Sequence, residues 1–334
     1  MSVTIKDVAR ESGVNISTVS RALNDEYGVH PETREHVIAV ASRLKYRPNR
    51  VARGLVTGRS NTLGLIVSDI RNPFFAEVAR GAEDAARAAG CDLVLCNSDL
   101  NAHKQIEYVH SLLAKHVDGI LMNSVAVLSR AQQEDLAQCP VPIVLLNGAT
   151  SRRNFSSVCA NNTAGGSLAA NYLLKLGHRV LGHITGPRRN GNLSDRARGF
   201  LTAVTADERC PPPLVLNGEN SFLGGYELTQ RLLDGNPGVT ALFAANDIMA
   251  FGAVRAIYES GRRIPQDLSL IGFDNVELAS ALHPPLTTIH QPKYEIGKAA
   301  VEILVARAGK HADRSPEFRV LDVELIERQS CQSV

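Results

Sequence analysis

The chain has 334 residues, of which 44% are hydrophobic, and its 36 Lys/Arg against 34 Asp/Glu give a formal net charge of +2. This length exceeds one ordinary domain, and this composition excludes a disordered or fibrous chain. The apolar runs are too short to span a membrane, the start MSVTIKDVAR lacks a secretory apolar run, and the six cysteines show neither CxxC nor zinc spacing. We therefore expect a cytoplasmic protein with reduced thiols, no metal site, no cofactor and no membrane contact.

Residues 4–24, TIKDVARESGVNISTVSRALN, predict two short amphipathic helices with a turn between them. Thr4 and Asp7 form a capping arrangement, and Ile5, Val8 and Ala9 fall on one helical face. Gly13 ends the first helix, and Asn15 is a suitable cap for the second. The second helix buries Val19, Ala22 and Leu23 and leaves an outer face that can enter a major groove, made of Ile16, Ser17, Thr18, Ser20 and Arg21.

A third helix is predicted from Pro31, a first-turn proline, to about Leu44. Val37, Ile38, Ala41 and Leu44 are expected to pack onto the first two helices. Three helices around one small core predict an all-α helix-turn-helix domain over residues 1–46. The alternative is an ordinary helical hairpin.

The next segment, YRPNRVARGLVTGRS at residues 46–60, is basic and has the spacing of one short helix. Residues 1–60 hold ten Lys/Arg and six Asp/Glu, a net charge of +4, so the remainder of the chain carries −2. A basic head on a faintly acidic body favours contact with phosphates through counterion release. A solvated linker would explain the arginines alone, but it explains the apolar Leu55 less well.

These two segments resemble the transcriptional regulators of the lactose repressor family, and the similarity covers essentially the full length. The resemblance implies that residues 47–60 are a hinge helix, that two hinges pair in a homodimer on double-stranded operator DNA, and that Leu55 wedges between base steps in the minor groove. It also implies base contacts from Ile16, Ser17 and Arg21, with Arg21 suited to guanine. The remaining DNA-binding residues implied in this way are Thr4, Thr18, Ser20, Asn24, Asn49, Ala52 and Arg53.

From residue 61 onward, short apolar runs alternate with amphipathic segments, which predicts parallel, helix-covered sheets. The first set has strands at 63–68, 91–96, 119–123 and 142–147, and helices near 74–89, 102–116 and 129–138. The second set has strands at 180–185, 213–217, 240–245 and 268–273, and helices near 163–176, 193–206, 222–234 and 247–260.

Two similar sets predict an α/β sensor of two lobes over residues 61–334, similar to periplasmic binding proteins. Chain crossings are expected near Ala160, Gln291 and Leu321. This places about 61–160 and 292–321 in lobe 1, and about 161–291 and 322–330 in lobe 2.

Polar and aromatic residues follow the predicted strands, where ligands of such sheets bind. Phenyl faces together with amides, a guanidinium and a carboxylate suit a sugar with vicinal hydroxyls. The segments NPFF, DRARGF, AAND, GFDN and ELASALHPPLTTIHQP resemble the ribose repressors of the family and the related ribose-binding proteins. The residues expected to bind the effector are Asn72, Phe74, Phe75, Asn147, Arg196, Phe222, Asn246, Asp274 and Gln291.

The pattern departs from the ribose type at one place, because Asn147-Gly148 stands where ribose-binding relatives carry an Asp-Arg pair. The preferred hydroxyl pattern is therefore open, although a pentose is the first expectation. Other interpretations apply to single residues. The phenylalanines can be core residues, and Asp247 is expected to cap the helix that follows it.

These observations predict a dimeric, sugar-controlled transcriptional repressor that is not an enzyme. Neither G-x-G-x-x-G nor a phosphate-binding loop is present, and the ten histidines are scattered. One alternative is a regulator with a purine or sugar-phosphate corepressor. A more distant one is an exported sugar-binding transport receptor, which the DNA-binding head disfavours. The tail ERQSCQSV has no leucine heptad, which favours a dimer over a tetramer.

Overall fold

The computed structural model describes residues 3–25, 27–47, 59–123, 128–146, 155–188, 190–308 and 315–334. The chain divides into two compact units, Met1–Ser60 and Asn61–Val334. Several expected functional residues lie outside the described residues, namely Asn49, Ala52, Arg53 and Leu55 of the expected hinge helix, and Asn147. No helix in the described ranges is long and apolar enough to cross a membrane.

The first unit contains three helices, α1 (Ile5–Ser12), α2 (Ile16–Leu23) and α3 (Pro31–Arg43). The Asp7 carboxylate accepts hydrogen bonds from the backbone N–H (3.0 Å) and the hydroxyl (2.8 Å) of Thr4, so the expected cap of α1 forms. Gly13 ends α1 with a left-handed φ of 68°. Asn15 occupies the cap position of α2, but its side chain makes no capping hydrogen bond.

The core of this unit is small and differs from the expected one at one position. The buried side chains are Val8, Ala9, Val19, Ala22, Val37, Val40 and Ala41. The expectation for Ile38 was wrong, because its side chain is 45% exposed and Val40 lies in the core instead. The spacing explains the exchange: positions 37, 40, 41 and 44 share one helical face, whereas residue 38 lies about 100° away from residue 37.

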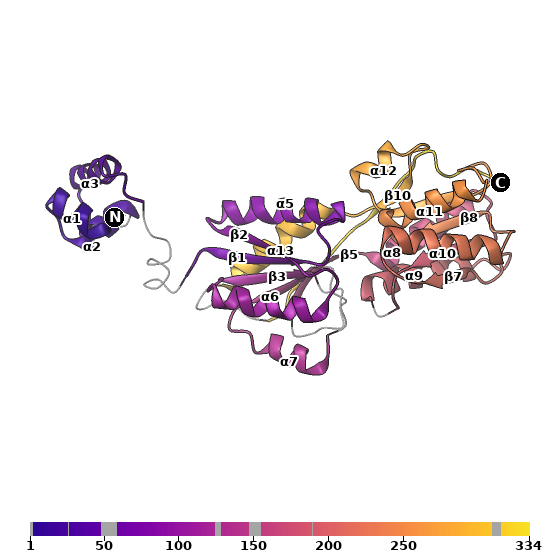
Figure 1. Cartoon of the computed structure of the whole chain (residues 1–334), viewed down its shortest axis with the longest axis horizontal. Helices are drawn as coiled ribbons and strands as arrows, with labels where there is room; N and C mark the ends of the chain where they lie inside the picture. The colour runs from indigo at the N-terminus through magenta and orange to yellow at the C-terminus, as the bar shows by residue number, and fades with distance from the viewer. Residues whose placement is uncertain are drawn as a thin grey trace. The chain divides into compact units, whose positions relative to one another are not determined.

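The first sheet of the second unit has six parallel strands in the order β11-β5-β4-β3-β1-β2 (Figure 1). The strands are β1 (Thr62–Val67), β2 (Asp92–Asn97), β3 (Gly119–Asn123), β4 (Ile143–Leu146), β5 (Ser156–Ala160) and β11 (Phe318–Leu321). One face packs against α5 (Pro73–Ala88) and α13 (Lys293–Arg307), and the other packs against α6 (Ala102–Ala114) and α7 (Arg130–Ala137). We call this sheet with its helices the first lobe.

The second lobe is built on a six-stranded sheet of order β12-β10-β9-β8-β6-β7. Its strands are β6 (Leu181–Thr185), β7 (Leu214–Asn217), β8 (Ala241–Ala244), β9 (Ser269–Asp274), β10 (Thr287–His290) and β12 (Glu324–Ile326). Helices α8 (Asn162–Lys175) and α9 (Gly191–Thr205) cover one face, and α10 (Phe222–Gly235) and α11 (Asp247–Glu259) cover the other. A short helix, α12 (Glu277–Ala281), follows β9.

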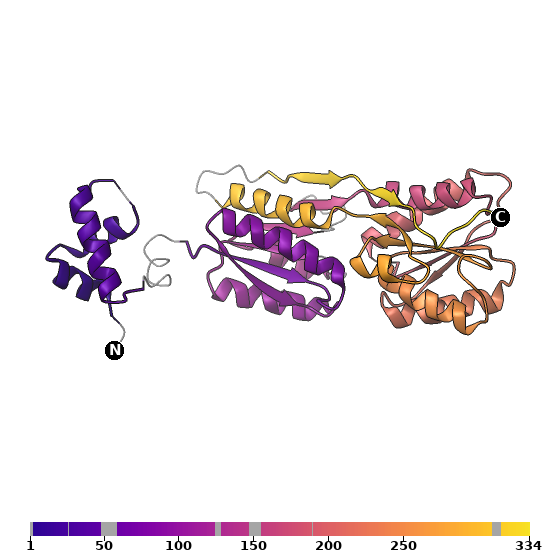
Figure 2. The same ribbon diagram turned by 90° about the horizontal axis from the view of Figure 1, so that it is seen from above.

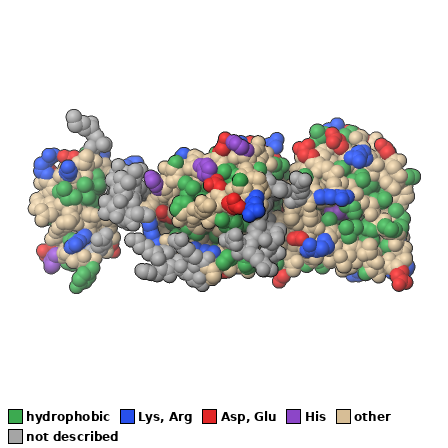
Figure 3. Space-filling model, turned by 90° about the horizontal axis from the view of Figure 1, so that it is seen from below, with side chains coloured by type: hydrophobic (Ala, Val, Ile, Leu, Met, Phe, Trp, Pro, Cys, Tyr) green, Lys and Arg blue, Asp and Glu red, His purple; other side chains and the backbone are tan. Residues whose placement is uncertain are grey.

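The two-lobed α/β fold with parallel sheets is the predicted one, with two differences in detail. Strand β12 is antiparallel to β10, so the second sheet is mixed. Elements β5, β10, β11, β12 and α13 were not predicted, and they lie around the three places where the chain passes between the sheets. At each of these places, a strand of one lobe is followed along the chain by an element of the other lobe (Figure 2). On the face seen in Figure 3, hydrophobic side chains of this unit are interspersed with charged ones.

Glycines allow three pairs of helices to approach each other closely. A Cβ on Gly81 of α5 would overlap the carbonyl oxygen of Tyr294 in α13, and a Cβ on Gly297 of α13 would overlap that of Val78 in α5. The pairs α8–α9 and α10–α11 meet in the same way, at Gly166, Gly199, Gly225 and Gly252. Because backbone atoms stand in the way, an added methyl group cannot be accommodated by rotating a side chain.

We predict that Gly81→Ala destabilises the second unit by about 1–3 kcal/mol, because the methyl group forces α5 and α13 apart. The matched control is Gly235→Ala, at the end of α10, where an added Cβ meets nothing within 4 Å. That change should be neutral or slightly stabilising. Urea denaturation of the two variants measures the difference, and equal midpoints would refute the close-packing explanation.

A buried histidine in the second lobe makes the stability of this lobe depend on pH. His183 is fully buried, stacks on Phe243 with ring centroids 4.6 Å apart, and its Nδ1 bonds the Phe243 carbonyl oxygen over 2.9 Å. Burial lowers the pKa of His183 from 6.5 to about 4. Because the pKa in the folded state is depressed, the neutral ring favours folding above pH 6.5, and this contribution is lost as the pH falls through 4.

We predict that His183 contributes up to about 3 kcal/mol to stability above pH 6.5 and that this contribution disappears between about pH 6.5 and 4. His183→Gln lacks this contribution, so the stability difference between wild type and variant should shrink as the pH falls through this range, whatever the absolute stability of the variant. His103→Gln, at an exposed position of α6, should keep the wild-type slope. The measurement is the free energy of unfolding at pH values from 4 to 8, and parallel curves for wild type and His183→Gln would contradict the assignment.

Candidate functional site

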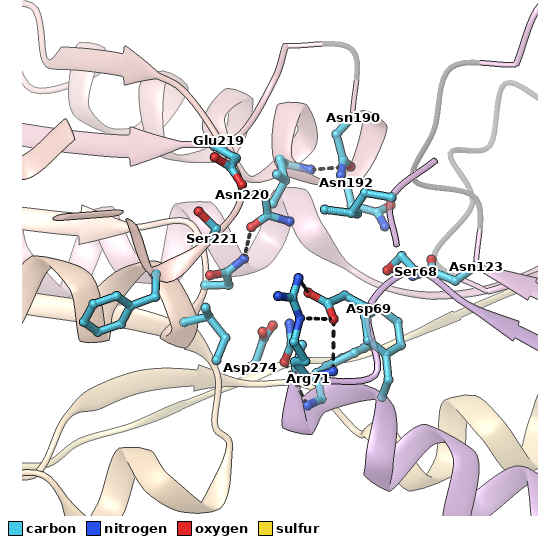
Figure 4. A pocket seen from close by; sticks show the side chains of 18 of the residues that line it. Ser68, Asp69, Arg71, Asn123, Asn190, Asn192, Glu219, Asn220, Ser221 and Asp274 are labelled. Carbon is cyan, nitrogen blue, oxygen red and sulfur yellow. Dashed lines mark hydrogen bonds and ion pairs between the residues drawn. The ribbon is translucent and has the colours of Figure 1, made fainter. Parts of the chain in front are cut away.

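A cavity of about 500 Å³ lies between the two lobes, where the carboxyl ends of both sets of strands meet (Figure 4). Eight of the nine residues expected from the sequence line it: Asn72, Phe74, Phe75, Arg196, Phe222, Asn246, Asp274 and Gln291. The ninth, Asn147, lies outside the described residues. This is the position predicted for ligands of open α/β sheets.

The charged centre of the cavity is a buried ion pair between Arg196 of α9 and Asp274 at the end of β9. Arg196 Nη1 lies 3.6 Å from Asp274 Oδ1, and the guanidinium stacks over the Phe273 ring at 3.7 Å. The same guanidinium donates to Asn162 Oδ1 (2.8 Å) and to the Ala245 carbonyl oxygen (2.6 Å). These contacts fix the guanidinium and hold it against the carboxylate.

Asp274 is held from a second direction by Gln291, whose Nε2 donates to Asp274 Oδ1 over 2.5 Å. Burial raises the pKa of the Asp274 carboxyl, and the positive charge of Arg196 opposes this rise. Burial lowers the pKa of Arg196, and Asp274 opposes that change in turn. Each charge therefore stabilises the other in a place that water does not reach.

Asp247 does not cap α11, contrary to the sequence expectation. The cap is Asn246, whose Oδ1 accepts from the Met249 N–H over 2.9 Å. Asp247 is the first residue of the helix, and its carboxylate instead accepts from the Thr288 hydroxyl (2.7 Å) and the Val276 N–H (2.9 Å). Burial and the nearby charge of Asp274 raise the pKa of Asp247 to about 7. The residue joins β10 and the segment after β9 to α11.

Side chains that cap helices surround the cavity. Asn72 Oδ1 accepts from the Phe74 N–H at the start of α5, and Asn190 and Ser221 cap α9 and α10 in the same way. Asn246 Nδ2 donates to Asn220 Oδ1 over 2.5 Å. The oxygens of Asn72, Asn190 and Asn220 are thus used within the protein, so these three residues present mainly amide donors to a ligand.

Two buried acceptors in the cavity wall have no hydrogen-bond partner among the residues that the structure describes: Asn123 Oδ1 at the end of β3 and Gln291 Oε1. Both side chains are almost fully buried. Asn123 Nδ2 donates to the Ser68 hydroxyl (3.0 Å), which fixes the amide and leaves its oxygen open. An unpaired buried acceptor is unfavourable, so each of these oxygens is suited to a donor group from a ligand.

Apolar surface and a second ion pair complete the wall. Phe74 and Phe75 are buried and meet edge to face with centroids 5.1 Å apart, whereas Phe222 is 41% exposed at the opposite side. Asp69 binds Arg71 through Arg71 Nε and Nη2, each over 2.9 Å. The hydrogen bond and charge of Asp69 raise the pKa of Arg71, and the charge of Glu219, across the cavity from this pair, raises it further (Figure 4).

Several lining residues were not among the sequence expectations: Ser68, Asp69, Arg71, Asn123, Asn190, Asn192, Glu219, Asn220 and Ser221. They follow strands β1, β3, β6 and β7, so the rule that located the other residues also applies to them. None of the described lining residues is a histidine or a cysteine. The described residues also contain no group of three His, Cys, Asp or Glu side chains arranged to hold a metal ion.

The residues expected to contact bases lie on the outer side of α2. Ile16 is 45% exposed, and Ser17 and Arg21 are also exposed. Thr18, Ser20 and Asn24 are half-buried, and Asn24 Nδ2 donates to the Ser20 hydroxyl over 3.4 Å. Thr4 is exposed at the start of α1. The apolar face of α2 points the other way, into the core of the unit.

Comparison with known proteins agrees with both units. Residues 4–49 match the family model of bacterial regulatory proteins, lacI family, and residues 170–331 match that of a periplasmic binding protein-like domain. The chain is 36% identical to the ribose operon repressor of Halalkalibacterium halodurans, over 92% of this chain and 91% of the relative. It is 37% identical to the HTH-type transcriptional repressor PurR of Edwardsiella ictaluri, over 98% and 96% of the two chains.

Solved structures give the same result. The lac repressor dimer bound to operator and the anti-inducer ONPF matches with a TM-score of 0.88 and 29% identity, over 100% of both chains. A lacI-family regulator from Enterococcus faecium with bound ribose matches with a TM-score of 0.73 and 33% identity, over 82% of this chain and 99% of the other. The helix-turn-helix unit, the two-lobed unit and the relatives together show that the chain belongs to the LacI family of bacterial regulatory proteins, a family of DNA-binding transcriptional regulators and not of enzymes.

Proposed function

We propose that this protein is a cytoplasmic repressor that binds a pseudo-palindromic operator as a homodimer and is controlled by a neutral, polyhydroxylated sugar in the cavity between its lobes. The family supports DNA binding, and the cavity supports the sugar. The observation that carries the choice of ligand is the balance of charges and hydrogen-bond groups in the cavity wall.

The charges of the wall favour a neutral ligand over a phosphorylated one. The positive charge of Arg196 is compensated by Asp274, and that of Arg71 by Asp69. No described Lys or Arg of the second lobe forms an ion pair with Glu219. The described wall therefore carries a net charge of −1. A phosphate group needs uncompensated cations or free backbone N–H groups. Here both arginines are paired with carboxylates, and each helix start at the cavity already has one N–H bonded to a capping side chain.

The hydrogen-bond groups favour a ligand that is rich in hydroxyls. Asn123 Oδ1 and Gln291 Oε1 require donors, whereas Asn72 and Arg196 offer N–H groups that require acceptors. A hydroxyl group is both donor and acceptor, so adjacent hydroxyls of a sugar satisfy both kinds of wall group. The rings of Phe74, Phe75 and Phe222 provide apolar surface for the ring faces of a sugar.

The relatives support this proposal without fixing the ligand. One similar structure contains bound ribose, one relative is named ribose operon repressor, and another is named HTH-type transcriptional repressor PurR. The test is a thermal-shift screen with neutral pentoses and hexoses, their phosphates and purines, followed by titration of DNA binding with each hit. A neutral sugar that alters operator affinity is the expected outcome. A response restricted to phosphates or purines would replace the proposed ligand by that class.

Asp274→Asn should weaken binding of the neutral sugar about 10- to 100-fold, because the neutral amide no longer balances Arg196 and leaves a buried guanidinium without its counter-ion. DNA affinity without sugar should stay close to that of the wild type. Asp234→Asn, an exposed position on α10, is the control and should change neither quantity. Isothermal titration gives the sugar affinity, and an unchanged value in Asp274→Asn would exclude this carboxylate from the site.

Arg21→Ala should weaken binding to a selected operator more than binding to random duplex, because an exposed arginine on α2 is suited to paired contacts with a guanine edge. The expected loss of discrimination is about 1–3 kcal/mol. Arg43→Ala, on α3 and bound to Glu11 over 2.7 Å, serves as the control. Duplexes selected from a random pool by the wild type provide the operator. Equal losses on specific and random DNA would assign Arg21 to phosphate contact only.

A further inference from the structure

Lys293 is a buried cation that joins the two lobes behind the effector cavity, where it contacts the backbone of the lining residues Asp274 and Gln291. It is the first residue of α13, a helix of the first lobe, and only 7% of its surface is exposed. Its ammonium nevertheless reaches the second lobe, where it donates to the carbonyl oxygens of Asp274 (2.7 Å) and Asn275 (2.9 Å) and lies 3.5 Å from that of Gln291. An ammonium has three donors, and here all of them are directed at backbone carbonyls.

The two nearer carbonyls belong to a backbone turn that needs support. Asp274 has a φ of 116° and Asn275 a φ of 54°, both in the left-handed region that favours glycine. Arg328 and His290 hold the side chain of Asn275, and the Asn275 N–H donates to the Thr288 hydroxyl over 3.4 Å. Lys293 binds the backbone carbonyls of both Asp274 and Asn275. The direction of the Asp274 carboxylate depends on this turn, because the carboxylate and the turn share one residue.

The backbone of Lys293 belongs to α13, which forms a closely packed pair with α5 in the first lobe. Helix α13 lies against α5 at Gly81 and Gly297, and the Tyr294 hydroxyl donates to Asp84 Oδ2 over 3.0 Å. Helix α5 begins with the cavity residues Asn72 and Phe74. A displacement of the turn at Asp274 therefore displaces the start of α13. Helix α13 is packed against α5, whose first turn forms the opposite wall of the cavity.

We propose that Lys293 is a positioning residue that fixes the left-handed turn at Asp274–Asn275, directs the Asp274 carboxylate into the effector cavity, and ties that turn to α13 and α5 of the first lobe. The inference rests on the proposed role of Asp274 in effector binding. It adds the contact that transmits effector binding from the second lobe to the first. Differential contacts of this kind are what a two-state allosteric change requires.

The test compares three full-length variants by hydrogen–deuterium exchange. Lys293→Met removes the donors at similar length, Lys293→Arg retains charge and donors, and Lys298→Met is the control at an exposed position of the same helix. We expect the backbone amides of residues 275–279, and those at the start of α5, to exchange at least tenfold faster in Lys293→Met. Lys293→Arg should lie closer to the wild type, and Lys298→Met should match it.

A second readout separates positioning from general loosening. Burial is the largest cause that lowers the pKa of His290, and the positive charge of Lys293 lowers this pKa further. The charges of Glu324 and Glu295 raise it. The groups facing Lys293 itself are the carboxylates of Asp274, Asp247, Glu77 and Glu295. Loss of the ammonium in Lys293→Met should raise the pKa of His290, followed by NMR of its ring, whereas Lys293→Arg should keep it low.

The proposal is overturned if Lys293→Met exchanges like the wild type at residues 275–279, or if only the turn loosens while the start of α5 is unaffected. Should Lys293→Met not fold, Lys293→Gln, which is uncharged but retains donors, is judged by the same two readouts. These measurements use no sugar, so their outcome is independent of the effector screen. The proposal for Lys293 can be refuted while the screen identifies a sugar, and the screen can identify none while the proposal for Lys293 is supported.

Discussion

The buried pair of Arg196 and Asp274 is the interaction on which the rest of the sensor unit depends. Asp274 ends β9 and Arg196 lies in the second turn of α9, and both side chains are too deeply buried for water to solvate their charges well. Each needs further partners, which are supplied by Asn162, by the Ala245 carbonyl oxygen and by Gln291. Because the charges of this pair already balance each other, the pair favours a ligand that exchanges hydrogen bonds and brings no charge of its own.

The arrangement also provides a physical connection by which the proposed effector site would act at a distance. Asp274 belongs to the second lobe, Gln291 lies where the chain returns to the first lobe, and Lys293 opens the helix that follows. The ligand-facing carboxylate, the crossing segment and the first helical turn of α13 are thus bonded to one another. Closing the cavity over a ligand can therefore shift the first lobe. A ligand held by one lobe alone would not favour one arrangement of the two lobes over another.

Much of this molecule could be predicted from its sequence, and the exceptions have physical causes. The ends of the predicted strands located eight cavity residues, because parallel sheets gather these ends at one edge. Strands such as β3 and β4 are evident from their apolar runs. Helix α13 was missed because it is buried against both α5 and the sheet, so it lacks a simple polar face. Strand β5, SSVCA, reads as polar although it is fully buried. Asp247 looked like a cap because local sequence does not reveal that Thr288 and Val276, distant in the chain, bind its carboxylate.

The central claim is that sugar in the cavity and operator on the first unit affect each other's binding. The most direct test titrates the sugar identified by screening into the full-length protein alone and into its complex with a selected operator duplex, at one salt concentration. The account predicts that operator changes the affinity for the sugar by the same factor by which the sugar changes the affinity for operator. Equal sugar affinity in both titrations would contradict it, because a ligand that does not distinguish the two states cannot control DNA binding.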